Sequence, residues 1–295
     1  MFACGKSRIQ GSILGSKACA TAASFVKMSF LANTNFTVAS GAGVITNGGG
    51  GLKAGVPTTT SRTYTIAEDL VLGDHQFWSI TNNGSGTTTL NVTGSISDGN
   101  NAFNLTKRGN GVLVLAGDNA YTGKTTIQTN GYAVLKHGHA LGSTVGITEI
   151  ENGGYIRIDG PSGGLVIDEP ITMTGDQALN YGGTLRSNTG SNIWTGKITS
   201  NGARLRCESG ACFEIQGGVD GSSLVCSAYG TRWIRFTEKP ISTAQFTSHT
   251  GDGGVIIAVT GNTFSAFNAC GYFVRIDVPN RSEERRVGKE CRSRW

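Results

Sequence analysis

The chain has 295 residues, of which 45 are glycine and only 15% are charged. That composition is typical of many short strands joined by tight turns, and it argues against a helical protein or an α/β enzyme. The formal net charge is +5, but six basic and three acidic residues lie in the last fifteen positions, and without them the charge is +2. So small a charge gives no case for binding to nucleic acid or a membrane surface, and no apolar run approaches the ~20 residues that span a bilayer.

Residues 1–62 contain no regular array of strand patterns. An apolar stretch at 20–32 is interrupted by Lys27 and is not followed by a clear small-residue cleavage site, so a signal peptide is not established. Four consecutive glycines at 48–51 and three threonines at 58–60 are typical of a flexible connector or a loosely formed first turn. We therefore expect a poorly defined N-terminal segment that acts as a linker or a cap.

Regular spacing follows, and it predicts one β-domain over residues 63–280. Short runs rich in β-branched and aromatic residues are separated by turns that contain Gly, Asn and Asp, as expected for strands. The runs predicted as strands in addition to the central stretch are 64–72, 76–80, 88–96, 132–136, 146–151, 155–159, 165–173, 184–187, 193–199 and 204–207.

The central stretch, residues 105–127, predicts a strand, a turn and a second strand. Its apolar runs, 112–115 and 125–127, are each bounded by Gly and Asn, which leaves no room for a helix. Side chains alternate along a strand, so the two valines of the first run are expected on one face and its two leucines on the other. Apolar residues on both faces are typical of a strand that is buried on both sides.

This stretch also resembles a known family. It has Leu-Thr-Lys at 105–107, Gly-Asn-Gly at 109–111, a Leu-rich strand, Gly-Asp-Asn-Ala-Tyr-Thr-Gly at 117–123 and then a Thr-rich strand. The pattern resembles the autotransporter-associated β-strand repeat, and similar text extends over roughly 64–205. The resemblance implies a right-handed parallel β-helix in a large bacterial protein that is exported and stays at the cell surface, attached to the outer membrane, or is released.

An internal repeat favours an array of stacked turns without reference to any family. Residues 251–258 echo 109–116 at an offset of 142, and 262–265 echo 119–122 at an offset of 143. The second copy is degraded and lacks the Thr-rich strand, which leaves its register open. We expect an all-β fold, a right-handed parallel β-helix, with an antiparallel β-sandwich as the alternative.

Two motifs invite a binding function, and neither predicts one here. The segment 117–125 is similar to a phosphate-binding loop, but five residues instead of four separate its glycines, and a strand follows in place of a helix. His137 and His139 have the i, i+2 spacing of a metal half-site on a strand, but Gly138 indicates a turn and no carboxylate lies near. We predict no nucleotide, metal or cofactor site.

A carbohydrate-active enzyme, a polysaccharide lyase or a glycoside hydrolase, is the main functional alternative, because parallel β-helices host such enzymes. These enzymes need carboxylates and basic residues that converge on one flank. Arg157 and Asp159 share a face of one predicted strand, either as catalytic groups or equally as an exposed ion pair between turns. The acids are mostly single and lie beside Gly or Pro, where Asp stabilises turns; they are Asp98, Asp118, Asp159, Asp168, Glu169, Asp176 and Asp220.

Ten aromatic residues could form a sugar-stacking strip on the flank of the coil, although packing inside the coil is the commoner role for such residues. They are Tyr64, Phe77, Trp78, Tyr121, Tyr132, Tyr155, Tyr181, Trp194, Tyr229 and Trp233. The six cysteines before residue 281 form no Cys-x-x-Cys pair, which excludes a zinc ribbon. Cys207 and Cys212 could close a small hairpin disulfide or remain thiols on neighbouring strands, and the state of Cys226 is open as well.

The last fifteen residues, 281–295, resemble the in-frame translation of a sequencing adapter, and we expect them to take no part in the fold. The natural reading frame is then expected to continue beyond residue 280. Together with the family resemblance, this predicts a non-catalytic passenger segment, a rigid spacer or an adhesin rod without catalytic residues. The expected partners are surface glycans, a host or neighbouring cell surface, and the remainder of its own longer chain.

Overall fold

The computed structural model describes residues 23–25, 27–32, 34–41, 43–55, 59–175, 182–249, 253–270 and 273–276. These residues form strands and no helix, so the described part of the chain contains no helix that could cross a membrane. The strand pairs run parallel throughout both halves of the chain. The expected all-β parallel β-helix is therefore confirmed, and the antiparallel sandwich is wrong.

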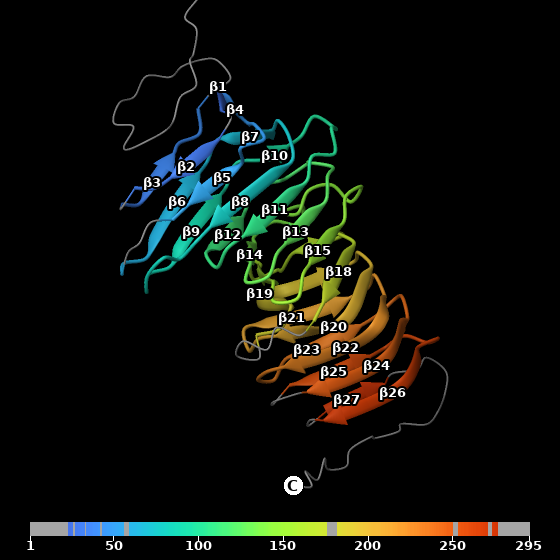
Figure 1. Ribbon diagram of the computed structural model, residues 1–295. Coiled ribbons are helices and arrows are strands. Elements are labelled where there is room, and N and C mark those ends of the chain that lie inside the picture. Colours follow the sequence, from blue (N-terminus) through green and yellow to red (C-terminus); the bar gives the residue numbers. More distant parts are fainter. Residues whose placement is uncertain are drawn as a thin grey trace, which may run out of the picture. The chain divides into compact units, whose positions relative to one another are not determined.

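The chain divides into two compact units, Met1–Glu149 and Ile150–Trp295. Unit 1 is built from short strands that lie one above another (Figure 1). Its strands are β1 (Ala23–Phe25), β2 (Met28–Phe30), β3 (Phe36–Val38), β4 (Val44–Asn47), β5 (Leu52–Ala54), β6 (Arg62–Ile66), β7 (Asp69–Leu72), β8 (Gln76–Ile80), β9 (Thr88–Val92), β10 (Ile96–Ser97), β11 (Leu105–Arg108), β12 (Val112–Leu115), β13 (Thr125–Ile127) and β14 (Tyr132–Leu135). Strand β15 (Thr148–Ile150) spans the boundary between the units.

The strands of unit 1 form three parallel stacks, one for each side of the coil. The first stack is β1, β4, β7 and β10. The second is β2, β5, β8, β11 and β13. The third is β3, β6, β9, β12 and β14. Successive turns add a strand to each side as far as β10 and to the second and third sides after it, which is the arrangement of a β-solenoid whose turns contact only their neighbours.

Unit 2 has the same parallel stacking with several longer strands (Figure 1). Its strands are β16 (Tyr155–Asp159), β17 (Val166–Ile167), β18 (Ile171–Thr174), β19 (Leu185–Trp194), β20 (Ile198–Cys207), β21 (Ala211–Ile215), β22 (Val219–Ala228), β23 (Trp233–Phe236), β24 (Ile241–His249), β25 (Gly254–Ile257), β26 (Thr263–Cys270) and β27 (Phe273–Ile276).

The long strands of unit 2 each serve two sides of the coil. The first half of β20 pairs with β18, whereas its second half pairs with β19. Between the halves lies Gly202, whose φ of +80° is one that L side chains rarely adopt, and this residue lets the strand turn the corner. The predicted strand at 204–207 is consequently the end of the longer strand β20, because the backbone pairing continues around the corner. The strand predicted at 193–199 was wrong as one strand, because 193–194 end β19, 198–199 begin β20, and 195–197 between them are not strand.

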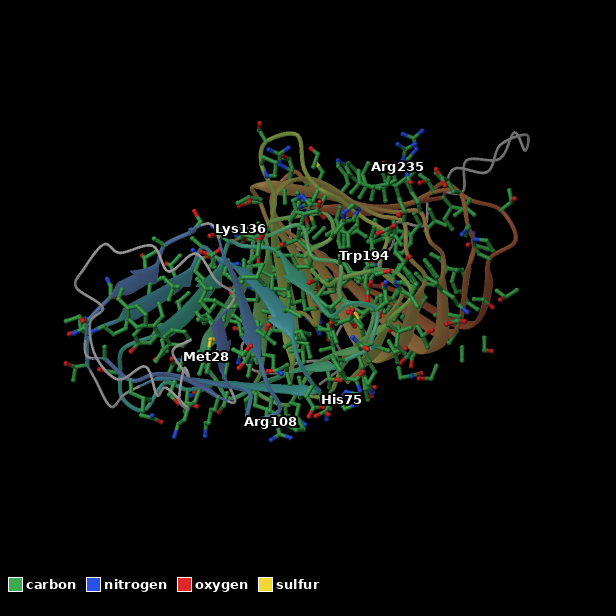
Figure 2. All side chains as sticks on the ribbon, turned by 90° about the horizontal axis from the view of Figure 1, so that it is seen from above. Met28, His75, Arg108, Lys136, Trp194 and Arg235 are labelled. Carbon is green, nitrogen blue, oxygen red and sulfur yellow. The ribbon has the colours of Figure 1, made fainter. Side chains whose placement is uncertain are left out.

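The interior follows from the alternation of side chains along each strand. In β9, for example, Thr88, Leu90 and Val92 point inward and are buried, while the residues between them are half-exposed. Figure 2 places Trp194 among the side chains that fill the interior of unit 2, whereas Arg235 lies at the outside. The rings of Phe246 and Phe267 stack in this unit, with their centres 5.4 Å apart and an angle of 3° between their planes.

The central stretch folds as its sequence predicts. Both leucines of β12 are fully buried, Val114 is buried on the other face with 8% of its surface exposed, and Val112 is half-exposed. The internal repeat is also structural, since β25 occupies the positions that the offset of 142 assigns to β12. The two copies differ after this strand, because β26 begins at Thr263, where the first copy has an extended corner.

The N-terminal segment 1–62 contains strands β1–β5 in its described part, and these strands pair within the three stacks of unit 1. Its role as a linker or a cap stays a prediction. Residues 1–22 and the segment 281–295 lie outside the described residues.

Candidate functional site

The corner between β12 and β13, residues 116–124, is tied to the turns on either side by one asparagine. The Asn119 side chain is 3% exposed; its Oδ1 accepts the Ile96 backbone N–H at 2.9 Å, and its Nδ2 donates to the Ala140 carbonyl at 2.6 Å. Buried backbone groups need such partners, so this amide fixes the stacking of three turns. Asn192 and Asn262 of unit 2 likewise accept backbone N–H groups from the preceding turn, both at 2.9 Å.

Asp98 organises the corner of the preceding turn. Its carboxylate accepts hydrogen bonds from the Thr122 N–H and hydroxyl, from the Phe103 N–H and from the Asn100 N–H, at 3.0 to 3.1 Å. Burial raises the pKa of Asp98, but these hydrogen bonds outweigh it and hold the pKa below its ordinary value. Three backbone N–H groups and one hydroxyl engage this carboxylate, so its role is to stabilise the turn.

The corner does not bind phosphate in the way its glycines suggest. Residues 125–127 form strand β13 and not a helix, so the helix N-terminus that a phosphate loop requires is absent there. A Cβ atom at Gly123 would lie 2.2 Å from the Phe103 carbonyl oxygen, which shows that the glycine permits close stacking of two turns. Tyr121 is fully buried, and its hydroxyl lies 2.6 Å from the Thr125 hydroxyl. The predicted strand in place of a helix after these glycines is confirmed.

Lys107, the lysine of the Leu-Thr-Lys lead, points into the coil. It lies in register between Trp78 and Ile127 and is fully buried. Its Nζ donates to the carbonyls of Arg108 at 2.8 Å and Gly109 at 2.6 Å. Burial lowers the pKa of Lys107 from 10.5 to about 7. Alternation along the strand from Leu105 was the signal that could have placed this lysine inside.

Asp118, His137 and His139 come together at adjacent corners, and we call them the Asp–His cluster. The Asp118 Oδ1 lies 2.8 Å from His139 Nδ1 and 3.7 Å from His137 Nδ1. The hydrogen bond with His139 holds the pKa of Asp118 below its ordinary value. The prediction that no carboxylate lies near the two histidines was wrong, because Asp118 belongs to the preceding turn and reaches them through the stacking of the coil.

In unit 2, three arginines stack on successive strands, and with two acids they form what we call the arginine ladder. Arg157 pairs in register with Arg186, and Arg186 with Arg206. Asp159 lies 2.7 Å from Arg157, and Glu208 lies 2.7 Å from Arg206 and 3.5 Å from Arg186. These acids offset the repulsion between like charges on neighbouring strands. Three bases and two acids therefore do converge on one flank.

The ladder is flanked by tyrosines. The guanidinium of Arg206 lies over the Tyr229 ring, 4.3 Å from its centre, in a cation–π contact. Burial raises the pKa of Tyr155, and the positive charges of Arg186 and Arg157 offset part of that effect. Arg157 and Asp159 pair with each other within one strand, which corrects the expected ion pair between turns.

The remaining acids are distributed along the chain. Asp220 lies 2.5 Å from Lys197 and accepts the Thr199 hydroxyl at 2.7 Å. Asp168 is exposed and Glu169 is buried, while Asp176 lies outside the described residues.

The ten aromatic residues do not form one strip. Tyr64, Trp78, Tyr121 and Trp194 are fully buried in the interior of their own units, as core packing predicts. Phe77 is 45% exposed and carries the Arg108 guanidinium 3.6 Å from its ring centre. The others are Tyr132, Tyr155, Tyr229 and Trp233, which are half-exposed, and Tyr181, which lies outside the described residues.

Cys207, Cys212 and Cys226 are free thiols. The Cys207 thiol donates to the Ala211 carbonyl at 3.3 Å, and Cys212 lies on the next strand, so the reading of two thiols on neighbouring strands holds. Burial raises the pKa of Cys207 to about 12 and also raises that of Cys226. Thiols with raised pKa values are poor nucleophiles, which assigns these two residues to the core.

Comparison with known families matches residues 105–132 to the Passenger-associated-transport-repeat. The match covers β11–β13, the corner that holds Asn119 and the first residue of β14, and it is narrower than the 64–205 over which the sequence resembles such proteins. No curated protein and no solved structure matches the chain significantly. The family match and the parallel β-solenoid together support a β-helix repeat protein of the autotransporter passenger type.

Proposed function

We propose that this chain, whose residues 105–132 match the Passenger-associated-transport-repeat and whose described strands form a parallel β-solenoid, serves as a non-catalytic rigid spacer or adhesin rod in a larger bacterial surface protein. The family implies a secreted or surface-exposed protein. Attachment to the outer membrane, and binding to surface glycans or to a host or neighbouring cell, belong to the proposal.

The observation that supports this proposal is that polar side chains at the corners and inside the coil form hydrogen bonds with backbone groups of the coil. Asp98 and Asn119 satisfy backbone groups of neighbouring turns, and Lys107 caps two carbonyls from inside. The hydrogen bonds of Asp98 and Asn119 join each turn to the next, which is what a rod needs and what chemistry on a substrate does not require.

Display on bacterial cells tests the role as a rod. The chain is fused to an export signal and an outer-membrane anchor, with an epitope at its N-terminus. We expect the epitope to be accessible on intact cells and the displayed chain to resist external trypsin, because stacked turns protect their backbone. Trp194→Asp, which places a charge in the core of unit 2, is the matched control and should be cleaved rapidly. Retention inside the cell, or equal cleavage of both forms, would contradict the proposal.

The arginine ladder is the specific observation that favours the alternative, a carbohydrate-active enzyme. Two carboxylates beside three guanidinium groups could bind and process an acidic polysaccharide. The purified chain should be incubated with acidic and neutral polysaccharides while reducing ends and unsaturated uronates are measured. We expect no product. Turnover that is lost in Glu208→Gln but kept in Glu149→Gln, a change outside the ladder, would replace the spacer proposal with this one.

A further inference from the structure

The Asp–His cluster owes its geometry to the register of two stacked strands. Strands β12 and β14 pair so that Leu115 lies beside Leu135. The chain leaves both strands at the same level, and Asp118 follows the first by three residues while His137 and His139 follow the second by two and four. Lys136, labelled in Figure 2, directly precedes the cluster and marks where it lies.

The backbone that carries the cluster is fixed on both sides. The Lys136 N–H donates to the Leu115 carbonyl at 2.9 Å, and Asn119 is bonded through its backbone N–H to the His139 carbonyl and through its side chain to the Ala140 carbonyl. Beyond the histidines, Ala140 and Leu141 are buried. Rigid neighbours of this kind keep donor atoms in place before a ligand arrives.

The side chains of the cluster are accessible to solvent. Their exposed fractions are 70% for Asp118, 39% for His137 and 56% for His139. The two imidazole rings lie 5.6 Å apart, centre to centre, at an angle of 70°. The His139 backbone N–H donates to His137 Nδ1 at 3.2 Å, which orients the first ring.

Donor atoms from all three residues lie within 4.8 Å of one another. Zinc bonds imidazole nitrogen and carboxylate oxygen at about 2.0–2.2 Å, so tetrahedral ligands are about 3.3–3.6 Å apart, a spacing that small rotations of exposed side chains reach from here. Two imidazoles and one carboxylate are a donor set that suits divalent transition metals and does not suit Ca²⁺ or Mg²⁺.

We propose that Asp118, His137 and His139 form a binding site for a divalent transition-metal ion, with Zn²⁺ as the physiological candidate. Three protein ligands leave one tetrahedral position open to water or to a donor from another molecule. This inference is independent of the proposed role as a rod, because the stacking of the turns does not depend on a bound metal ion.

The test uses the full chain, and it must separate histidine binding from thiol binding. The accessible cysteines are first alkylated with N-ethylmaleimide, because exposed thiolates compete for Zn²⁺. The chain has only four histidines, so long-range ¹H–¹⁵N spectra resolve each imidazole during a titration with Zn²⁺. We expect the resonances of His137 and His139 to shift to saturation at one equivalent, while those of His75 and His249 stay in place.

Matched variants are measured by calorimetry with Zn²⁺. His139→Ala should weaken binding at least tenfold, Asp118→Asn should weaken it less because the amide oxygen remains a donor, and His249→Ala should leave it unchanged. All three replace exposed side chains, and circular dichroism confirms that they fold. The proposal is overturned if all four imidazoles respond alike, if none responds, or if His139→Ala binds as tightly as the unchanged chain.

Discussion

The two units stack their turns in different ways: unit 1 has corners of variable length that side chains tie together, and unit 2 has long strands that repeat at a nearly constant spacing. In unit 1 the corners vary in length: Leu105 is in register with Gln76 and with Thr125, and the turn that leads to Leu105 is nearly half as long again as the turn that leaves it. Asn119 and Asp98 tie these corners to their neighbours. In unit 2, from β19 onward, the repeat is nearly constant, since Leu205 lies in register with Leu185 and Cys226 and is almost equally far along the chain from both.

This difference indicates where a β-solenoid can place clusters of polar and charged side chains. Where turns vary in length, side chains must satisfy the backbone groups of the corners, and these corners then hold clusters such as Asp118 with the two histidines. Where turns are constant, long strands carry the pairing around the corners, and charged groups lie on the strand faces, as Arg186 and Arg206 of the arginine ladder do.

The largest expected loss of stability comes from truncating a buried side chain, and it compares how tightly the interiors of the two units are packed. Leu115 in β12 and Ile257 in β25 occupy corresponding repeat positions and are both fully buried. Truncation of either to Ala should cost about 2–5 kcal/mol of unfolding free energy, because each leaves a cavity between stacked turns. Denaturation in urea measures this, and Val112→Ala, a half-exposed change on β12, should cost less than about 1 kcal/mol. A negligible loss for Ile257→Ala would show that unit 2 is packed more loosely.

The corner asparagines should differ between the units. Asn119→Ala leaves the buried Ile96 N–H and Ala140 carbonyl without their side-chain partner and should cost about 2–4 kcal/mol. Asn262 is half-exposed and bonds only Ile241 and its own neighbour Val259, so Asn262→Ala should cost about 1 kcal/mol. Asn119→Asp, which keeps the acceptor, should fall between. Equal losses at Asn119 and Asn262 would remove the distinction drawn between the corners.

The two units should respond to alkaline pH in opposite directions. The pKa of Lys107 falls on folding from 10.5 to about 7, so the unfolded chain binds more protons between these values and the stability of unit 1 rises with pH. From pH 7 to pH 8.5 the gain should be on the order of 1–2 kcal/mol. In unit 2 the pKa of Cys207 rises on folding from 9.0 to about 12, so stability falls as pH rises above about 9.

Hydrogen exchange resolved by unit measures both trends, with one variant for each. Lys107→Met should flatten the rise in unit 1, and Cys207→Ala should reduce the fall in unit 2. If Lys107→Met keeps the slope of the unchanged chain between pH 7 and pH 8.5, the buried amine is not its source.

The smallest effects concern ion pairs. Lys124 and Glu149 in unit 1 form an exposed pair at 2.8 Å, and Lys124→Met should change the unfolding free energy by less than about 0.5 kcal/mol. Glu208 in unit 2 is 21% exposed and contacts two arginines, so Glu208→Gln should cost about 1 kcal/mol and lose part of that cost in high salt. Thermal unfolding with and without salt compares the two. A larger effect at Lys124 would reverse the ranking.

Local patterns were enough to predict strands and turns, because alternation and Gly-bounded apolar runs are properties of neighbouring residues. Parallel stacking was predicted from the internal repeat and the family resemblance. The contacts between turns were not predictable, since they depend on corner lengths. Asp118 reaches His139 only because Leu115 pairs with Leu135, and the ladder exists only because Arg157, Arg186 and Arg206 share one register. Lys107 is a different case, because its inward position follows from alternation and was overlooked.

The constant repeat of unit 2 has a consequence for how such a chain can change its length. Leu205 and Cys226 occupy equivalent places on consecutive turns, so removal of the segment 205–225 joins Arg204 directly to Cys226, which then takes the place of Leu205 on the strand. Every side chain beyond the junction keeps its inward or outward orientation. A deletion that is longer or shorter by a single position instead reverses the side chains that follow the junction on the same strand, up to the next bulge or corner. Duplication or loss of a whole turn therefore alters the reach of the protein without requiring a new core.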